Sequence, residues 1–382
     1  MAITYSRRDK MRIQSITLRE FELPLLRPFE TSGGVQKVRR ILLVQIKDSE
    51  GIEGVAECVA PEYPDYTAET VDTAWHALTR WIGPLLLGKE IAYTDVYDYL
   101  EARIRGHRMA KAAIEMAGWV LEAERRGISL AQLLGGTRSE IEVGISLGIQ
   151  QDVARLIEHI QEAIERGYRR IKLKIKPGKD VAPVAQVREV FGEQLPLMVD
   201  ANNAYTLEDS SQLQLLDTFQ LMMIEQPLEW EDLVRHAILQ QQLKTPICLD
   251  ESITSPMRAE DMVRLGSGKI INLKPARVGG FMPSLRIHAF CQQKGIPLWC
   301  GGMLESGVGR AYNVALASLP GFSLPGDISE SQRYWMEDIV APAWEMHRPG
   351  YMAVPLEQVG LGVEILWDRV YSAMTRECTL TL

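Results

Sequence analysis

Three carboxylates recur at a fixed interval in the middle of the chain, and each closes a short apolar run. Asp200 ends LPLMVD, Glu225 lies in LMMIEQP and Asp250 lies in PICLDES, so the spacing is 25 residues twice over. A period of that length holds one strand and one helix, which is the repeat of a parallel βα barrel. All strands of such a barrel run in the same direction, so the three acids are expected to meet at one face around a cavity.

Lysine-bearing strands lie one interval to either side of these acids. Lys174 stands in IKLKIK, 26 residues before the first acid, and Lys274 stands in KIINLKP, 24 residues after the last. Lys172 and Lys174 share one face of their strand, because alternate residues of a strand point the same way. A buried lysine is costly unless it meets carboxylates, so both are placed in the cavity and Lys176 in the following loop. The alternative is an exposed edge strand with a basic face.

Oxygen ligands in this number suit a hard divalent cation such as Mg²⁺, with Mn²⁺ as a substitute. Each acid also has the alternative interpretation of capping the helix that follows its strand. Asp250 and Glu251 are adjacent, so only one of them is expected to face the cavity. Asn202, Gln226, Glu251 and Arg277 are candidates for hydrogen bonds around the metal ligands, and Asn202 and Gln226 could equally be turn residues.

A metal with a lysine on each side is the arrangement needed to take a proton from a carbon next to a carboxylate. A divalent cation on that carboxylate stabilises the enediolate that forms. Near a cation and a second ammonium group, the pKa of a lysine is expected to fall towards the range of a general base. The 301–307 loop, GGMLESG, is expected to offer backbone N–H groups to a substrate carboxylate at a helix start.

Composition narrows the class of protein further. A chain of 382 residues is long enough for two domains, and its net charge of −8 argues against broad nucleic-acid binding. No apolar run approaches the roughly 20 residues that span a bilayer, and the N-terminus lacks the apolar core of a signal peptide. The five cysteines show no CxxC spacing, which indicates a reducing, cytoplasmic location. The histidines form neither HxH nor HExxH, so a zinc amidohydrolase barrel is not expected.

The order of sequence patterns predicts an α+β domain in front of the barrel. Residues 12–58 alternate as strands, with a lid expected at 28–35, and 67–135 have helical spacing. Barrel strands are expected at 141–149, 170–176, 196–200, 221–225, 246–249, 269–273 and 297–300, with a final strand at 322–327. The domains are expected at 11–135 and 136–328, with a C-terminal segment, 329–382, that packs back on the first domain.

Six motifs together resemble the enolase superfamily, and within it the muconate-lactonising subgroup. They are IKLKIKPG, VDANNAYTLED, IEQPL, CLDESI, INLKPARVGG and WCGGMLESGVGR. The similarity runs from about Met11 to the end of the chain and is greatest to the branch of o-succinylbenzoate synthases and N-succinylamino acid racemases. It implies an α+β capping domain on a (β/α)7β barrel, with Lys174 and Lys274 as the acid/base pair and Lys172 close by. It implies Mg²⁺ ligands at Asp200, Glu225 and Asp250.

The resemblance implies two reactions. In the synthase reaction, a syn-dehydration of 2-succinyl-6-hydroxy-2,4-cyclohexadiene-1-carboxylate in menaquinone biosynthesis, Lys174 removes the α-proton and then protonates the departing hydroxide. Lys274 lies as a cation against the enediolate. In the racemase reaction the two lysines work from opposite faces, and Arg277 matches an arginine of members with that activity. Ala276 and Tyr312 depart from the glycine and histidine usual there.

We therefore expect a magnesium-dependent carbon–oxygen lyase, with the synthase reaction first. The racemase reaction, or another subgroup reaction at a carboxylate α-proton, is the alternative. Specificity is expected in the lid and in the 59–66 and 301–307 loops. The residues expected to contact substrate are Phe29, Ser146, Met303, Ser306 and Gly307. The expected partner is a small-molecule carboxylate, with no nucleic acid and no membrane, and the base-rate expectation is a homo-oligomer.

Two other classes of protein stay open from the residues alone. A Schiff-base aldolase barrel needs one buried lysine and no carboxylate trio, and it would stay active in EDTA. A non-catalytic binding protein would have no turnover to lose, whereas an enzyme with Lys174→Ala would keep ligand affinity and lose turnover.

Overall fold

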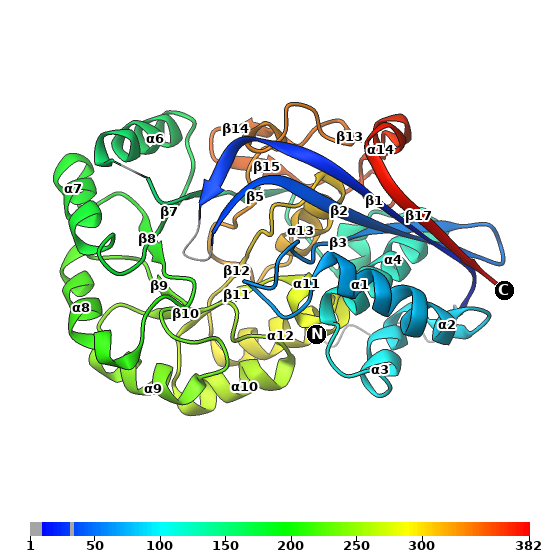
Figure 1. Cartoon of the computed structure of the whole chain (residues 1–382), viewed down its shortest axis with the longest axis horizontal. Coiled ribbons are helices and arrows are strands. Elements are labelled where there is room, and N and C mark those ends of the chain that lie inside the picture. The colour runs from blue at the N-terminus through cyan, green and yellow to red at the C-terminus, as the bar shows by residue number, and fades with distance from the viewer. Residues whose placement is uncertain (1–9, 31–33, 151) are drawn as a thin grey trace.

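The computed structural model describes residues 10–30, 34–150 and 152–382. Figure 1 shows a ring of parallel strands with helices outside it on the left, and an antiparallel sheet with helices on the right. The last strand of the chain returns to the sheet that contains the first strand. The expected architecture, an α+β capping domain on an α/β barrel, is confirmed.

The capping sheet has the order β17-β1-β2-β3, with β4 added beside the start of β1. Its strands are β1 (Lys10–Glu30), β2 (Val35–Asp48), β3 (Glu53–Cys58), β4 (Glu90–Ala92) and β17 (Met374–Thr381). Its helices are α1 (Val71–Ala77), α2 (Gly83–Leu86), α3 (Val96–Glu101), α4 (Arg108–Arg126) and α5 (Leu130–Leu134). Helix α4 is buried along most of its length and ends where Gly127 takes a left-handed φ of 63°, which suits glycine.

In the part of the chain that the structure describes, the barrel sheet contains seven parallel strands, in chain order from β6 to β12. They are β6 (Ile145–Leu147), β7 (Ile171–Lys174), β8 (Leu197–Asp200), β9 (Ile224–Glu225), β10 (Ile247–Leu249), β11 (Ile270–Leu273) and β12 (Leu298–Cys300). The outer helices are α6 (Val153–Glu165), α7 (Val181–Phe191), α8 (Ser210–Leu215), α9 (Leu233–Gln242), α10 (Pro256–Leu265), α11 (Pro275–Val278), α12 (Phe281–Lys294) and α13 (Gly307–Ala317).

The two ends of the barrel sheet differ from expectation. The strand expected at 141–149 is divided, because β5 (Glu140–Glu142) pairs antiparallel with β15 (Tyr351–Ala353) and only β6 joins the barrel. The strand expected at 322–327 forms two isolated bridges, from Phe322 to β12 and from Gly326 to Val143. This segment closes the barrel at both edges, but Pro325 has no N–H group to continue a ladder.

Inward-facing residues of the barrel form layers, because side chains alternate along each strand. A lower layer is apolar and consists of Met198, Met223, Cys248, Ile270 and Trp299. Two residues beyond the first three of these, towards the carboxyl ends of the strands, come Asp200, Glu225 and Asp250. The fold thus places the carboxylates at the barrel mouth above an apolar floor.

The C-terminal tail contacts both parts of the molecule. The strands β14 (Met346–Arg348) and β15 form a small sheet with β5 beside the barrel, and β13 (Val340–Ala341) pairs with β16 (Glu364–Ile365). Beyond them α14 (Trp367–Ala373) leads into β17, which pairs antiparallel with β1 of the capping sheet. The expected contact of the tail with the capping domain is therefore made by its last strand.

Candidate active site

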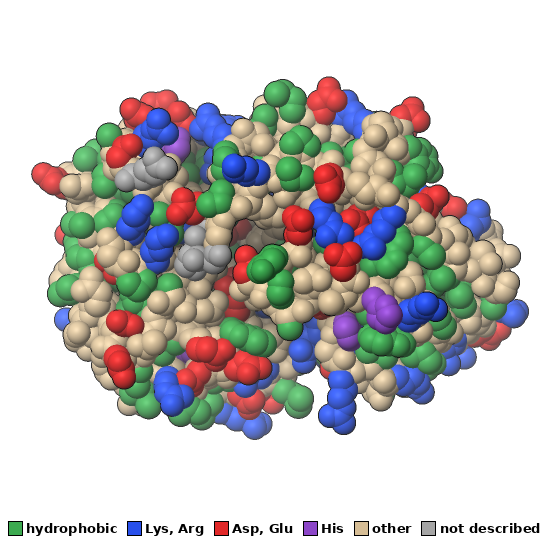
Figure 2. Space-filling model, in the orientation of Figure 1, with side chains coloured by type: hydrophobic (Ala, Val, Ile, Leu, Met, Phe, Trp, Pro, Cys, Tyr) green, Lys and Arg blue, Asp and Glu red, His purple; other side chains and the backbone are tan. Residues whose placement is uncertain are grey.

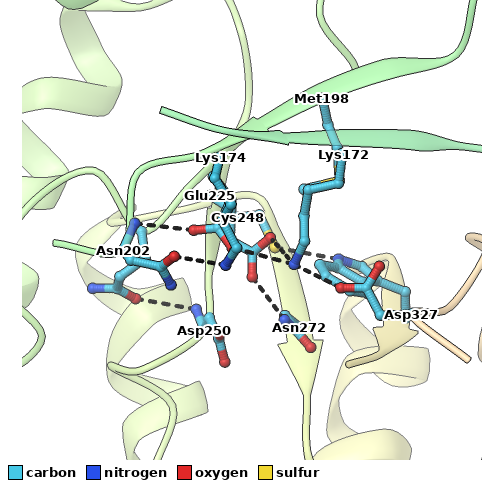
Figure 3. A network of polar contacts seen from close by, with 12 residues as sticks. Lys172, Lys174, Met198, Asn202, Glu225, Cys248, Asp250, Asn272 and Asp327 are labelled. Atoms are coloured by element: carbon cyan, nitrogen blue, oxygen red, sulfur yellow. Dashed lines mark hydrogen bonds and ion pairs between the residues drawn. The ribbon is translucent and has the colours of Figure 1, made fainter. Parts of the chain in front are cut away.

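The lysines of β7 lie against the first two acids of the repeat. Lys174 pairs with Asp200 across β7 and β8, and Asp200 pairs with Glu225 across β8 and β9. Lys174 Nζ lies 2.7 Å from Asp200 Oδ2. Lys172 Nζ lies 3.2 Å from the same oxygen and 3.1 Å from Glu225 Oε2. Figure 3 shows the side chains of Lys172 and Lys174 extending from β7 towards those of Glu225 and Asn202. Lys176 lies beyond the strand, 3.5 Å from Glu30 of the lid.

The second acid/base candidate stands on the far side of the acids. Lys274 directly follows β11, and its Nζ lies 2.8 Å from Asp250 Oδ2. Arg277 of α11 donates to Asp250 Oδ1, and the Tyr66 hydroxyl donates to the same oxygen at 3.1 Å. Asn272 Nδ2 donates to Glu225 Oε1 at 2.7 Å. The structure thus brings the five residues of the predicted site to one barrel mouth, with the carboxylates between the two lysines.

The three carboxylates are almost completely withdrawn from solvent. Asp200, Glu225 and Asp250 are 0%, 0% and 1% exposed. Burial raises the pKa of Asp200, but Lys174 and Lys172 have the larger effect and lower this pKa to about 2. Burial and the neighbouring Asp200 carboxylate raise the pKa of Glu225. A concentration of buried negative charge of this kind needs cations close by.

The pKa values of Lys172 and Lys274 move in the direction opposite to the sequence-based expectation. Burial lowers the pKa of Lys172, but the carboxylates of Asp327, Glu225 and Asp200 raise it more. Burial also lowers the pKa of Lys274, and the Tyr66 oxygen with the carboxylates of Glu251 and Glu225 outweighs that effect. The expected fall in the lysine pKa depended on a bound metal cation. The protein's own carboxylates raise the pKa of Lys172 and Lys274 instead.

The residues at the barrel mouth fit a hard divalent cation by donor chemistry. They supply carboxylate and amide oxygens, and Glu251 Oε2 and Asn272 Oδ1 are buried without a hydrogen-bond partner among the described residues. Within the described ranges no three His, Cys, Asp or Glu side chains stand close enough to form a ready-made metal cluster. The reason is visible in the contacts, since Lys172 lies between two of the acids and Lys274 and Arg277 hold the third.

Neighbouring polar residues fix the acids and lysines in place. Asn202 Oδ1 accepts from Lys174 at 2.6 Å, and its amide donates to Glu251 at 2.9 Å. The Gln226 side-chain oxygen accepts from the backbone N–H groups of Asp250, at 3.1 Å, and of the residue two further on. The expectation that only one of Asp250 and Glu251 faces the cavity is wrong. Strand β10 ends at Leu249, so both lie in a turn where strand alternation no longer applies.

The predicted substrate contacts fall into two groups. Ser146 pairs with Lys172 across β6 and β7, and its buried Oγ has no hydrogen-bond partner in the described part of the chain. Phe29 is the residue before the last of β1 and packs edge-on to Tyr334, with 6.4 Å between ring centroids. Met303 is half-buried beside the core. These three positions are compatible with substrate contact.

The start of α13 does not offer free N–H groups, contrary to expectation. The Ser306 N–H and hydroxyl donate to Glu57 of β3, at 3.0 Å and 2.6 Å, and the Gly309 N–H donates to the same carboxylate. The Gly307 N–H donates to Asp338 at 2.8 Å. Buried carboxylates of the protein therefore occupy the positive end of this helix. Ser306 joins the barrel to the capping domain, and Gly307 joins it to the C-terminal segment.

Several residues of the site had not been predicted. Asp327 pairs with Lys172 at 2.6 Å and also binds Arg170. Asp327 lies 27 residues after Cys300, so the same interval pointed to it, and Asn272 lies two residues before Lys274 on the same strand face. Tyr66 lies in the 59–66 loop that was expected to govern specificity, but nothing in the sequence singled it out.

The surface above these residues is hollowed. Figure 2 shows a depression between the barrel and the capping domain, with acidic side chains around it. The ribbon of β1 and β2 reaches across the barrel mouth in Figure 1, where Glu30 O accepts from the Ile149 N–H at 3.2 Å. The expected lid segment at 28–35 thus contacts the barrel at Glu30, and its role as a lid stays a prediction. Positions 31–33 lie outside the described residues.

Barrel, capping domain and a mouth of paired acids and lysines together define a class of protein. Residues 14–135 match the N-terminal domain of mandelate racemase and muconate lactonizing enzyme, and 155–369 match the enolase C-terminal domain-like family. The chain belongs to this family of the enolase superfamily. Within the described residues no helix combines the length and apolar character needed to cross a bilayer.

Particular relatives are similar over nearly their whole length. The o-succinylbenzoate synthase of Geobacillus kaustophilus is 49% identical over 92% of this chain and 93% of its own. The N-succinylamino acid racemase of Thermus thermophilus is also 49% identical, over 95% of this chain and 100% of its own. A solved enolase superfamily member from Listeria innocua matches with a TM-score of 0.93 and 43% identity, over 97% of this chain and 99% of that one.

Proposed function

We propose that this chain is a magnesium-dependent o-succinylbenzoate synthase that dehydrates 2-succinyl-6-hydroxy-2,4-cyclohexadiene-1-carboxylate through an enediolate intermediate, in menaquinone biosynthesis. The observation that carries the proposal is the placement of Lys174 and Lys274 on opposite sides of Asp200, Glu225 and Asp250. Relatives of that name at 44–49% identity support the choice of reaction.

Each side chain has a task that follows from its position. Mg²⁺ bound to the three acids would act as a Lewis acid on the substrate carboxylate and stabilise the enediolate. Lys174 Nζ takes the α-proton and then returns a proton to the departing hydroxyl group on the same face. Lys274, whose pKa is raised by its surroundings, stays an ammonium group and stabilises negative charge from the other face. Ser146, Phe29 and Met303 are placed to contact the remainder of the substrate.

N-succinylamino acid racemase is the second candidate, and a specific observation favours it. Arg277 donates to the carboxylate that also binds Lys274, so Asp250 is shared between two cations. Sharing weakens the hold of that carboxylate on the Lys274 proton, and a lysine on each face is what racemisation requires. A racemase from Amycolatopsis is 48% identical over 92% of this chain.

The test compares both reactions in the same preparation. Dehydration is followed by the absorbance of the aromatic product and racemisation by polarimetry, each with Mg²⁺ and with EDTA. The proposal predicts that EDTA and Lys174→Ala both abolish dehydration. A larger kcat/KM for racemisation would make that the main reaction. Dehydration that survives in the Lys174→Ala/Lys274→Ala double variant would contradict both candidates.

The remaining expectations concern the protein's surroundings. The cysteines at 58, 248, 291 and 300 are buried thiols without disulfides, which suits the reducing cytoplasm. A small-molecule carboxylate is the proposed partner, and the homo-oligomer stays a prediction.

A further inference from the structure

We propose that Tyr66, supplied by the capping domain, is a positioning residue that holds Lys274 for proton transfer on its face of the substrate. The proposal rests on the proposed function, in the sense that it assigns a role around one of the two acid/base lysines. It distinguishes the two faces, because nothing equivalent from the capping domain holds Lys174 in the described contacts.

The Tyr66 hydroxyl is the centre of a compact set of contacts. It accepts from Lys274 Nζ at 3.1 Å and from Arg277 Nη1 at 3.1 Å, and it donates to Asp250 Oδ1 at 3.1 Å. The Lys274 ammonium group also lies 4.8 Å from the centroid of the Tyr66 ring. A cation at that distance is attracted by the aromatic face. Ring and hydroxyl therefore hold the same ammonium group in two ways.

Lys174 is held differently. Its partners Asp200 and Asn202 are the last residue of β8 and a residue of the turn after it, so both belong to the barrel. Tyr66 lies in the connection between β3 and α1, so it reaches Lys274 only when the capping domain is docked on the barrel. One lysine is thus positioned by the barrel alone and the other by the barrel and the cap.

Proton transfer is sensitive to this kind of positioning, because a displacement of about 1 Å can cost roughly 100-fold in rate. Tyr66→Phe removes the hydroxyl and keeps the ring. The three polar contacts disappear, while the aromatic face stays over the ammonium group. The variant should therefore slow transfers at Lys274 and spare those at Lys174, whereas a general loss of stability would slow both.

The experiment measures exchange of the α-proton of each N-succinylamino acid enantiomer in D₂O by NMR, at saturating Mg²⁺. Lys174→Ala and Lys274→Ala assign each enantiomer to its lysine. Tyr66→Phe should lower kcat by roughly 10- to 100-fold for the Lys274 enantiomer and by less than about 2-fold for the other. Asn202→Gly, at a position with a positive φ of 41° that glycine accepts, should show the opposite selectivity.

Tyr312→Phe is the matched control. Its hydroxyl also joins barrel and cap, donating to the backbone oxygen of Glu57 at 2.9 Å, but it contacts neither lysine. This variant should change both exchange rates equally and only slightly. Equal losses for both enantiomers in Tyr66→Phe would overturn the proposal, because they would indicate that Tyr66 acts through Asp250 or through stability.

A second measurement does not need turnover. Reductive methylation with formaldehyde and cyanoborohydride, mapped by peptide mass spectrometry, reports the access to each lysine amine. Lys274 should be labelled faster in Tyr66→Phe than in the wild type, with Lys174 unchanged, and an unchanged Lys274 rate would overturn the proposal. If the wild type exchanges neither enantiomer, the racemase activity fails, and the labelling alone decides the role of Tyr66.

Discussion

Asp327 provides a quantitative test of the charge arrangement under the site. Its carboxylate lies 2.6 Å from Lys172 Nζ and also binds Arg170. Arg170 is completely buried and stacks on Trp299 at 4.4 Å from the ring centroid. Lys172 keeps two other carboxylates when Asp327 is lost, but Asp327 is the carboxylate that the structure pairs with Arg170. Asp327→Asn therefore leaves a buried guanidinium group without its counter-charge while preserving the shape of the side chain.

The expected cost follows from burial. Removing one partner of a buried ion pair costs about 3–5 kcal/mol, because the remaining charge is desolvated and unpaired. The matched control is Asp98→Asn, which breaks the pair of Asp98 with Arg286, at 2.6 Å and with side chains 57% and 43% exposed. Exposed pairs of this kind contribute about 0–1 kcal/mol. The two substitutions change the same chemical group and differ in its surroundings.

The assay is urea unfolding followed by tryptophan fluorescence, with the change in the free energy of unfolding taken from the midpoints. We expect Asp327→Asn to lose at least about 3 kcal/mol and Asp98→Asn less than about 1 kcal/mol. Adding Arg170→Met to Asp327→Asn should recover part of the lost stability, because this second substitution removes the unpaired guanidinium charge. Equal effects of the two single substitutions would mean that Arg170 is not dependent on Asp327.

Three further predictions concern pH, metal and substrate. Burial raises the pKa of Glu57 to about 7, against the opposing effects of Ser306 and Arg39. Because the pKa of Glu57 is higher in the folded state than the unfolded value of 4.5, protonated Glu57 stabilises the fold. This stabilisation is complete below pH 4.5 and is lost as the pH rises through about 7. Glu57→Gln should therefore flatten the fall of Tm between about pH 5 and 8, and an unchanged slope would count against this. Asp200→Asn, Glu225→Gln and Asp250→Asn should each weaken Mg²⁺ binding by at least about 10-fold in calorimetry, and wild-type affinity in any of them would remove that residue from the ligand set. Ser146→Ala should raise KM for the proposed substrate without lowering Tm, because its buried hydroxyl has no hydrogen bond among described residues to lose; a lower Tm with unchanged KM would show a structural role.

The regular part of the site could be predicted from the sequence, because each βα repeat presents its inward positions in the same way. Asp200, Glu225 and Lys274 come at or directly after strand ends, so the interval alone brought them to one face. The same interval would have indicated Asp327. The barrel seam at 322–327 was harder, because Pro325 prevents a continuous ladder while the segment still closes the barrel.

The contacts between the domains could not be predicted, because they depend on how the two parts dock. Tyr66 lies in an irregular loop. Glu57 caps the start of α13 by accepting from Ser306, which lies 249 residues further along the chain. Only one of Asp250 and Glu251 was expected to face the cavity, because the rule of alternation was extended beyond the end of β10. In each case the residue lies outside a barrel strand or makes its contact across the two domains, so the strand periodicity could not predict its position.

A crystal structure with Mg²⁺ and o-succinylbenzoate bound is the decisive observation for the proposed chemistry. We expect one metal ion coordinated by oxygens of Asp200, Glu225 and Asp250 at about 2.1 Å, with the ligand carboxylate on the same ion. Lys174 and Lys274 should then face the ligand from opposite sides. A metal bound elsewhere, or both ammonium groups on one side of the ligand, would contradict the assignment of these five residues.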